Sequence, residues 1–290
     1  MKKKLIILGI GLIAVFLLLN YKGIGANINI KIEDEGLRAK ILEEKKSSGE
    51  KIKLYDVQYM RQLYYIPPTD DEIYGMIFRG EEIPEFKPLT TLNDFQYFES
   101  LVHLKIAIDT NNLKGLENLK QLETLEVISD NSNSLDVSAI KNLPELSAVD
   151  FNVQGKIENL ETLADMPQLY ALGLHDYPYE EAHVLSKITN LRDLTLTNWS
   201  GMTDLSCISD LTNLERIEIK NCDSLQSLSG LEALKNVERI YFTKCYRLTD
   251  ISALKELPNL KEISFYACPY IEDTEFLNEL PEDVYVYIDE

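Results

Sequence analysis

Between residues 211 and 280 the apolar positions recur every 23 residues. Each copy begins with apolar residues spaced L-x-x-L-x-L-x-x-C, and the first copy runs from Leu211 through Ile217 and Ile219 to Cys222. The alternating L-x-L part has the period of two that makes a short strand with one buried face. The apolar residues that follow suit a 3₁₀-like or extended return. One coil cannot bury its own apolar face, so the pattern predicts copies stacked into a solenoid.

The same spacing extends back to about residue 96, with variation in the length of the returns. The last residue of each signature is, in chain order, Asp109, Asp130, Gln154, Tyr177, Trp199, Cys222, Cys245 and Cys268. A ninth, partial strand is predicted at residues 284–288. Such spacing is the signature of the leucine-rich repeat. The predicted fold is therefore an α/β leucine-rich repeat solenoid, a right-handed curved parallel β-sheet with 3₁₀ or extended convex returns.

Residues 27–95 lack this pattern and are predicted to form a mainly helical N-terminal cap, leaving 96–290 for the repeats. The first helix is expected over residues 34–46, with Asp34 as its N-cap. A short strand and a second helix follow, the second helix placed on Met60, Leu63 and Tyr64 and ended by the prolines at 67–68. A cap is physically required, because the first coil would otherwise expose its core to water.

Several stretches of this chain resemble internalin-like leucine-rich repeat proteins of bacterial surfaces. They are I-E-D-E-G-L-R-A-K-I-L at 32–42, K-L-Y-D-V-Q-Y-M-R-Q-L at 53–63, the first coil from residue 89, and L-T-D-I-S-A-L-K-E-L-P-N-L at 248–260. The resemblance implies a non-catalytic surface protein that binds a protein or peptide ligand through its concave sheet. The chain departs from that family at Cys222, Cys245 and Cys268, where its best-known members keep Asn and their coils are usually one residue shorter.

The first 26 residues are predicted to be a signal peptide or an N-terminal signal anchor. Three lysines at 2–4 precede fifteen residues, Leu5 to Leu19, that carry no charge. If the segment is uncleaved, residues 5–21 are just long enough to span a membrane, and the lysines place the body outside. If it is cleaved near residue 25 or 26, the body is secreted. Both readings predict export, to the cell membrane or beyond it.

The net charge and the positions of the cysteines and histidines exclude several classes of partner and of active site. The net charge of −19 argues against nucleic acid as a partner. Cys222, Cys245 and Cys268 are expected to point into the stack with a structural role, while Cys207 lies on a return. The polar stretch 129–136 lacks the glycine and bidentate glutamate of a calcium loop, and the three histidines fall too far apart for a catalytic set. The sequence therefore predicts no enzyme, no metal and no cofactor.

The remaining candidate is the outward face of the strands. Small residues at its centre, among them Ala148, Ala171 and Gly173, predict a shallow trough. Tyrosine and arginine, the residues that dominate binding hot spots, gather towards the C-terminal end. The predicted ligand-binding residues are Arg216, Arg239, Tyr241, Tyr266, Tyr285 and Tyr287. A plainer reading is that tyrosine suits exposed strands. A different function stays open: a self-assembling structural component of the cell envelope that pairs through its uncapped C-terminal strand.

Overall fold

The computed structural model describes residues 28–45, 51–83, 85–130, 134–272 and 274–289. The predicted signal or anchor segment, residues 1–26, lies outside these ranges, as does the middle of the polar stretch 129–136. Within the described ranges, no helix is both long enough and apolar enough to cross a bilayer.

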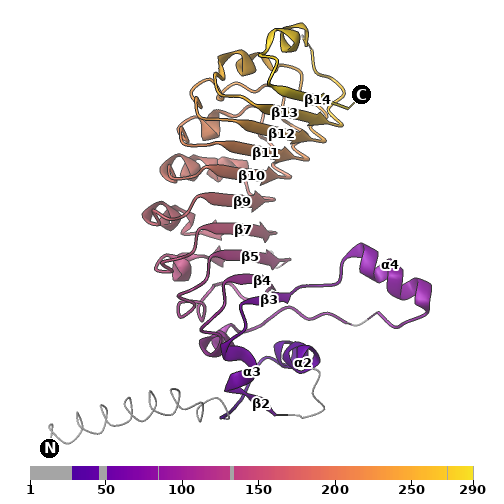
Figure 1. Ribbon diagram of the computed structural model, residues 1–290, viewed down its shortest axis with the longest axis vertical. Coiled ribbons are helices and arrows are strands. Elements are labelled where there is room, and N and C mark those ends of the chain that lie inside the picture. The colour runs from indigo at the N-terminus through magenta and orange to yellow at the C-terminus, as the bar shows by residue number, and fades with distance from the viewer. Residues whose placement is uncertain (1–27, 46–50, 84, 131–133, 273, 290) are drawn as a thin grey trace, which may run out of the picture.

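A ten-stranded parallel sheet runs the length of the molecule, and consecutive coils supply neighbouring strands (Figure 1). Its strands, in order along the sheet, are β3 (Gln62–Tyr65), β4 (His103–Ala107), β5 (Thr124–Ser129), β7 (Ala148–Val153), β9 (Ala171–His175), β10 (Asp193–Thr197), β11 (Arg216–Lys220), β12 (Arg239–Thr243), β13 (Glu262–Tyr266) and β14 (Tyr285–Ile288). The predicted solenoid is confirmed, and its nine predicted strands are all present.

The predicted second helix over Met60, Leu63 and Tyr64 is wrong. A short helix, α3 (Leu54–Gln58), comes earlier, and the chain then enters the sheet as β3. In β3, Leu63 and Tyr65 point inward while Tyr64 is exposed. This is the period of two expected of a strand, and β3 pairs in parallel with β4. The sheet therefore begins one strand before the first full repeat.

The convex side consists of short returns, most of them 3₁₀ turns. They are η2 (Asn93–Tyr97), η3 (Ser138–Ile140), η4 (Leu160–Asp165), η5 (Tyr179–Lys187), η6 (Ser206–Ile208), η7 (Ser252–Glu256) and η8 (Glu275–Glu279), together with the parallel pair β6 (Leu135–Asp136) and β8 (Ile157–Glu158). Inward side chains of strands and returns form one continuous apolar core along the stack. That continuity is why each coil depends on its neighbours.

The cap packs on the first coil through buried carboxylates. Strands β1 (Asn29–Ile30) and β2 (Ile52–Lys53) pair antiparallel beside helix α2 (Glu35–Glu44). Asp34 is the N-cap of α2, as predicted, and accepts a bond of 3.0 Å from the Leu37 amide. The fully buried carboxylate of Asp94, in the first coil, accepts bonds of 2.9 Å from the amides of Glu33 and Asp34. Asp94 thus ties the cap to the repeats.

Helix α4 (Asp70–Arg79) stands away from both the cap and the stack (Figure 1). The chain leaves the sheet after β3 and returns to it at Leu89, which bridges to Ile108. Thr69 caps the start of α4 in a reciprocal pair with Glu72, and Gly80 ends it with a left-handed φ of 68°. None of its ten residues is buried.

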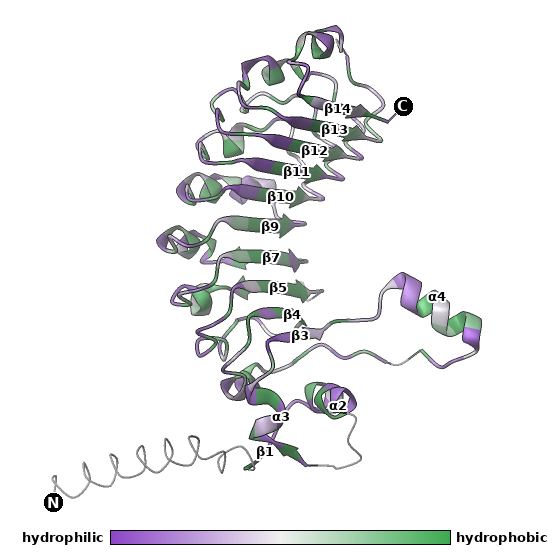
Figure 2. Ribbon diagram, viewed as in Figure 1, coloured by the Kyte–Doolittle hydropathy of each residue, from purple (hydrophilic) through white to green (hydrophobic). Residues whose placement is uncertain are grey.

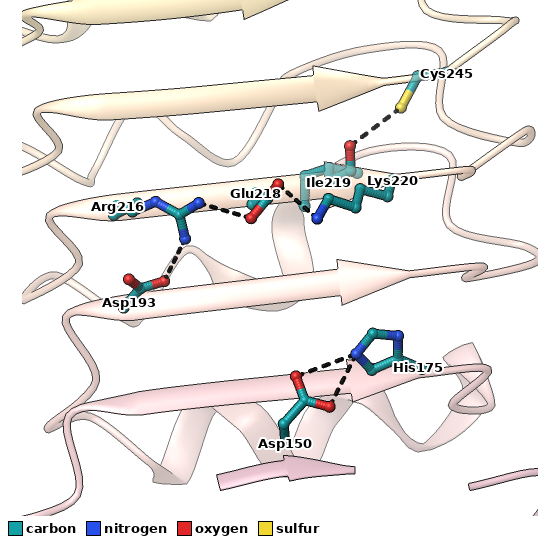
Figure 3. Close-up of polar contacts among 8 residues, drawn as sticks. All are labelled: Asp150, His175, Asp193, Arg216, Glu218, Ile219, Lys220 and Cys245. Atoms are coloured by element: carbon teal, nitrogen blue, oxygen red, sulfur yellow. Dashed lines mark hydrogen bonds and ion pairs between the residues drawn. The ribbon is translucent and has the colours of Figure 1, made fainter. Parts of the chain in front are cut away.

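The three cysteines lie inside the stack, as the sequence predicts, and all are free thiols. Cys222 donates to the Lys220 carbonyl at 3.3 Å, and Cys245 lies 3.9 Å from the Ile219 carbonyl of the preceding coil (Figure 3). The carbonyl partners of the three thiols belong to their own or to the preceding coil. Burial raises the pKa of Cys222 to about 11. The thiols therefore fill the interior of the turn and form hydrogen bonds with backbone carbonyls there.

Candidate binding face

The concave face of the sheet presents three rows of side chains, because the strands are paired in strict register. In β10, β11 and β12, for example, Asp193 lies beside Arg216 and Arg216 beside Arg239. Inward residues alternate with these rows and are buried. The outward rows are therefore fixed by the backbone and are accessible on one side of the molecule.

A hollow of about 420 Å³ lies on this face over the first two thirds of the sheet. Its floor contains the small residues Ala148, Ala171 and Gly173, where the sequence predicts a trough. Its walls carry larger polar side chains: Tyr64, His103, Lys105, Glu126, Asp150, Asp193 and Arg216. Tyr64 was missed by sequence reasoning because β3 was read as helix.

Several charged side chains around the hollow bind each other across neighbouring strands. Lys105 lies 2.6 Å from Glu126, and the imidazole Nε2 of His175 lies 3.1 Å from Asp150 (Figure 3). Gly173 makes the second pair possible, since a Cβ there would collide with the Asp150 carboxylate. The hydrogen bond to Asp150 raises the pKa of His175, against the opposing effect of its partial burial.

A chain of ion pairs closes the C-terminal end of the hollow. Arg216 binds Asp193 at 3.0 Å and Glu218 at 2.7 Å, and Lys220 reaches the other oxygen of Glu218 at 2.7 Å (Figure 3). Partial burial acts to raise the pKa of Glu218, but hydrogen bonds from Lys220 and Arg216 outweigh it and lower the pKa. Opposite charges on adjacent coils of one row were the sequence signal for the Asp193–Arg216 pair, whereas Glu218 pairs with residues two positions away in its own strand.

The six predicted ligand-binding residues all lie on the concave face, but some of their side chains are engaged in contacts within the protein and others are exposed. Arg216 is held by its two carboxylates, and its guanidinium lies 5.1 Å from the centre of the Tyr241 ring. The Tyr241 hydroxyl donates to Glu262 at 2.9 Å. Arg239 is half-exposed, with Glu238 at 3.8 Å. Only part of the predicted cluster is therefore available without breaking an internal contact.

The exposed part of that cluster consists of three tyrosines. Tyr266, Tyr285 and Tyr287 are 47%, 61% and 40% exposed. Tyr285 lies beside Glu262, and Tyr287 and Tyr241 flank Ser264 in the middle row. These tyrosines stand on the neighbouring strands β13 and β14, so they place exposed aromatic side chains at the C-terminal end of the concave face.

We found no arrangement that indicates metal chemistry. Among the described residues, no group of three or more His, Cys, Asp or Glu side chains could hold a metal ion. His103 contacts the hydroxyl of Thr124 at 2.9 Å, while His175 is engaged with Asp150. What the concave face offers is shape, paired charges and aromatic area, which are features of a binding surface.

The fold has relatives among solved structures. Internalin C2 of Listeria monocytogenes superposes with a TM-score of 0.56 at 21% identity, over 79% of this chain and 92% of that one. An internalin F from the same organism gives 0.52 at 17% identity, over 88% of this chain and 82% of that one. A chain of the Drosophila Toll–Spätzle complex gives 0.51 at 16% identity, over 62% of this chain and 25% of that one.

Searches by sequence add nothing to these likenesses, as no family model and no curated protein matches the chain. At identities this low, the structural likenesses show the fold alone, and they agree with the parallel sheet and the stacked coils described above. The chain has an internalin-like leucine-rich repeat fold.

Proposed function

We propose that this chain is a non-catalytic binding protein whose concave sheet holds a protein or peptide partner. The observation that carries the proposal is the continuous concave surface, with a hollow of about 420 Å³ at one end and exposed tyrosines at the other. Large amphipathic rings on rigid strands offer contact area at little cost in side-chain entropy. One of the structures with a similar fold belongs to a protein complex, that of Toll with Spätzle.

The charges on this face favour a partner that is neutral or basic. Lys105, His175 and Arg216 already bind carboxylates of the same sheet. The molecule as a whole carries −19, so an acidic partner would be repelled at long range. The partner is expected to bury tyrosine rings and to place small or apolar side chains in the hollow.

The proposed setting is outside the cell. Lys2, Lys3 and Lys4 followed by the uncharged run Leu5 to Leu19 support export. With an uncleaved segment, the body is tethered to the outer side of the membrane, and with a cleaved one it is secreted. Either location lets the concave face meet proteins outside the cell.

Photocrosslinking from the concave face tests this proposal. A photoreactive phenylalanine analogue replaces Tyr266 in the full chain, and cells producing it are irradiated together with the cells among which they live. We expect covalent adducts with a protein. The same analogue at Tyr270, which is 64% exposed and lies beyond the end of β13, should give none. Equal adducts from both positions, or none from Tyr266, would contradict the proposal.

Self-assembly is the second candidate function, and β14 is the observation that favours it. This strand pairs only with β13 at the end of the described sheet, and it exposes Tyr285, Tyr287 and Ile288. An edge of this kind can pair with a second chain. Sedimentation of the full chain decides the matter: self-assembly requires an oligomer that Tyr287→Lys dissociates and Tyr241→Ala leaves intact.

A further inference from the structure

Helix α4 carries three exposed large apolar side chains, more than any other described element outside the ten-stranded sheet. The Phe78 side chain is 93% exposed, Tyr74 is 70% exposed and Ile77 is 56% exposed. On a helix of 3.6 residues per turn these three lie on one side together with Ile73. Figure 2 shows hydrophilic residues at both ends of α4 and hydrophobic residues between them.

A helix like this is not self-sufficient in water. It has ten residues, and isolated helices shorter than about 12–15 residues are marginal even when they are rich in alanine. Both ends of α4 are nevertheless capped. Thr69 and Glu72 form a reciprocal cap at its start, and Gly80 ends it in a left-handed conformation. Capped ends and an uncovered apolar side together indicate that another surface covers α4.

The charges around α4 decide what kind of surface that is. Asp70, Asp71 and Glu72 precede its apolar residues, and Glu81 and Glu82 follow them. The one base in this segment, Arg79, is bound through two nitrogens to Glu81. Carboxylates at both ends repel an anionic membrane surface. They also repel a second copy of this acidic chain.

We propose that α4 is a docking helix that inserts Tyr74, Ile77 and Phe78 into an apolar groove of another protein, and that lysines or arginines line the ends of that groove. The mode is the binding of an amphipathic helix in a groove. At α4 this chain would supply the helix that enters a groove of the partner. At the concave face it would supply the surface that receives the partner. The two contacts use separate parts of the molecule, so one chain can hold two proteins together.

The test is photocrosslinking from α4 in the full chain. A photoreactive phenylalanine analogue replaces Phe78, and producing cells are irradiated as before, alone and among their neighbouring cells. We expect a covalent adduct between α4 and a protein that is neither a second copy of this chain nor the partner captured at Tyr266. Ile77→Asp should abolish the adduct without lowering the midpoint of thermal unfolding, because no residue of α4 is buried. Asp70→Asn combined with Asp71→Asn should lower its yield at least threefold.

A matched variant controls for the loss of charge. Glu145→Gln combined with Asp210→Asn removes two exposed carboxylates from other parts of the chain, and the yield of adduct should stay unchanged. Tyr266→Ala should also leave the Phe78 adduct intact, so failure of the concave-face proposal is distinguishable from failure of this one. Adducts with lipid alone, adducts with a second copy alone, no adduct, or equal effects of the two double variants would each overturn the inference.

Discussion

Lys244 and Ala267 adopt a left-handed backbone conformation where earlier coils place asparagine. Their φ angles are 55° and 52°, and those of Asn198 and Asn221 are 61° and 52°. Each of these residues directly precedes the inward side chain that fills the turn, Trp199 or one of the three cysteines. The turn takes this conformation in five consecutive coils, from Asp176 to Ala267, and asparagine tolerates it better than lysine or alanine.

Ala267→Gly should therefore stabilise the protein. Glycine removes the steric cost of the left-handed conformation but adds freedom to the unfolded chain, which leaves a net gain of about 0.5–1 kcal/mol. Urea unfolding measures the change. Ala233→Gly, at an exposed turn position with ordinary φ, is the control and should lose stability. A loss at both positions would show that residue 267 is not strained.

The ion pair between His175 and Asp150 on the concave face should make the stability of the fold depend on pH. The folded pKa of His175 is raised by Asp150, so the ion pair stabilises the fold fully below the unfolded value of about 6.5. That contribution is lost as the pH rises through the folded pKa. Asp150→Asn should lower the pKa of His175 and reduce stability more at pH 5 than at pH 8. NMR titration of the ring protons measures the first effect; an unchanged His175 pKa in the variant would contradict it.

At the scale of elements, the 23-residue period was enough to predict most of the sheet. The period sets which residues alternate inward, and stacking then fixes the neighbours, so Asp193, Arg216 and Arg239 fall in one row as expected. The period could not reveal β3 or the excursion to α4, which lie where no repeat exists to compare. Contacts such as that of the Arg216 guanidinium with the Tyr241 ring could not be predicted either. The spacing of residues along the sequence does not determine in which direction a side chain points within its row.

The buried carboxylate of Asp94 is one of the polar contacts that attach the cap to the first coil. Asp94→Ala would leave the amides of Glu33 and Asp34 without their acceptor, at a cost of about 2–3 kcal/mol. Hydrogen exchange should then accelerate in β1 and α2 while β9 to β13 keep their protection. Glu99→Ala, an exposed position in the same first coil, is the control. Uniform acceleration along the whole stack would show that the cap and the repeats unfold as one unit.

For the whole molecule, one long sheet places the hollow and the tyrosines on a single face, while α4 lies apart from it (Figure 1). A solenoid transmits little between distant coils, because each contacts only its neighbours. The two proposed contacts should therefore act independently: variants of α4 should not change binding at the concave face. The strongly acidic surface should make both contacts selective for neutral or basic proteins.

The dissociation constant of the partner captured at Tyr266, measured for the wild-type chain and for alanine variants, tests the central claim most directly. Tyr266→Ala and Tyr285→Ala should each weaken binding by about 2 kcal/mol, roughly thirtyfold, as expected of interface hot spots. Folding should suffer little, since neither side chain belongs to the buried core. Tyr270→Ala, the matched control, should leave the constant unchanged. Equal dissociation constants for the wild type and both concave-face variants would contradict the account.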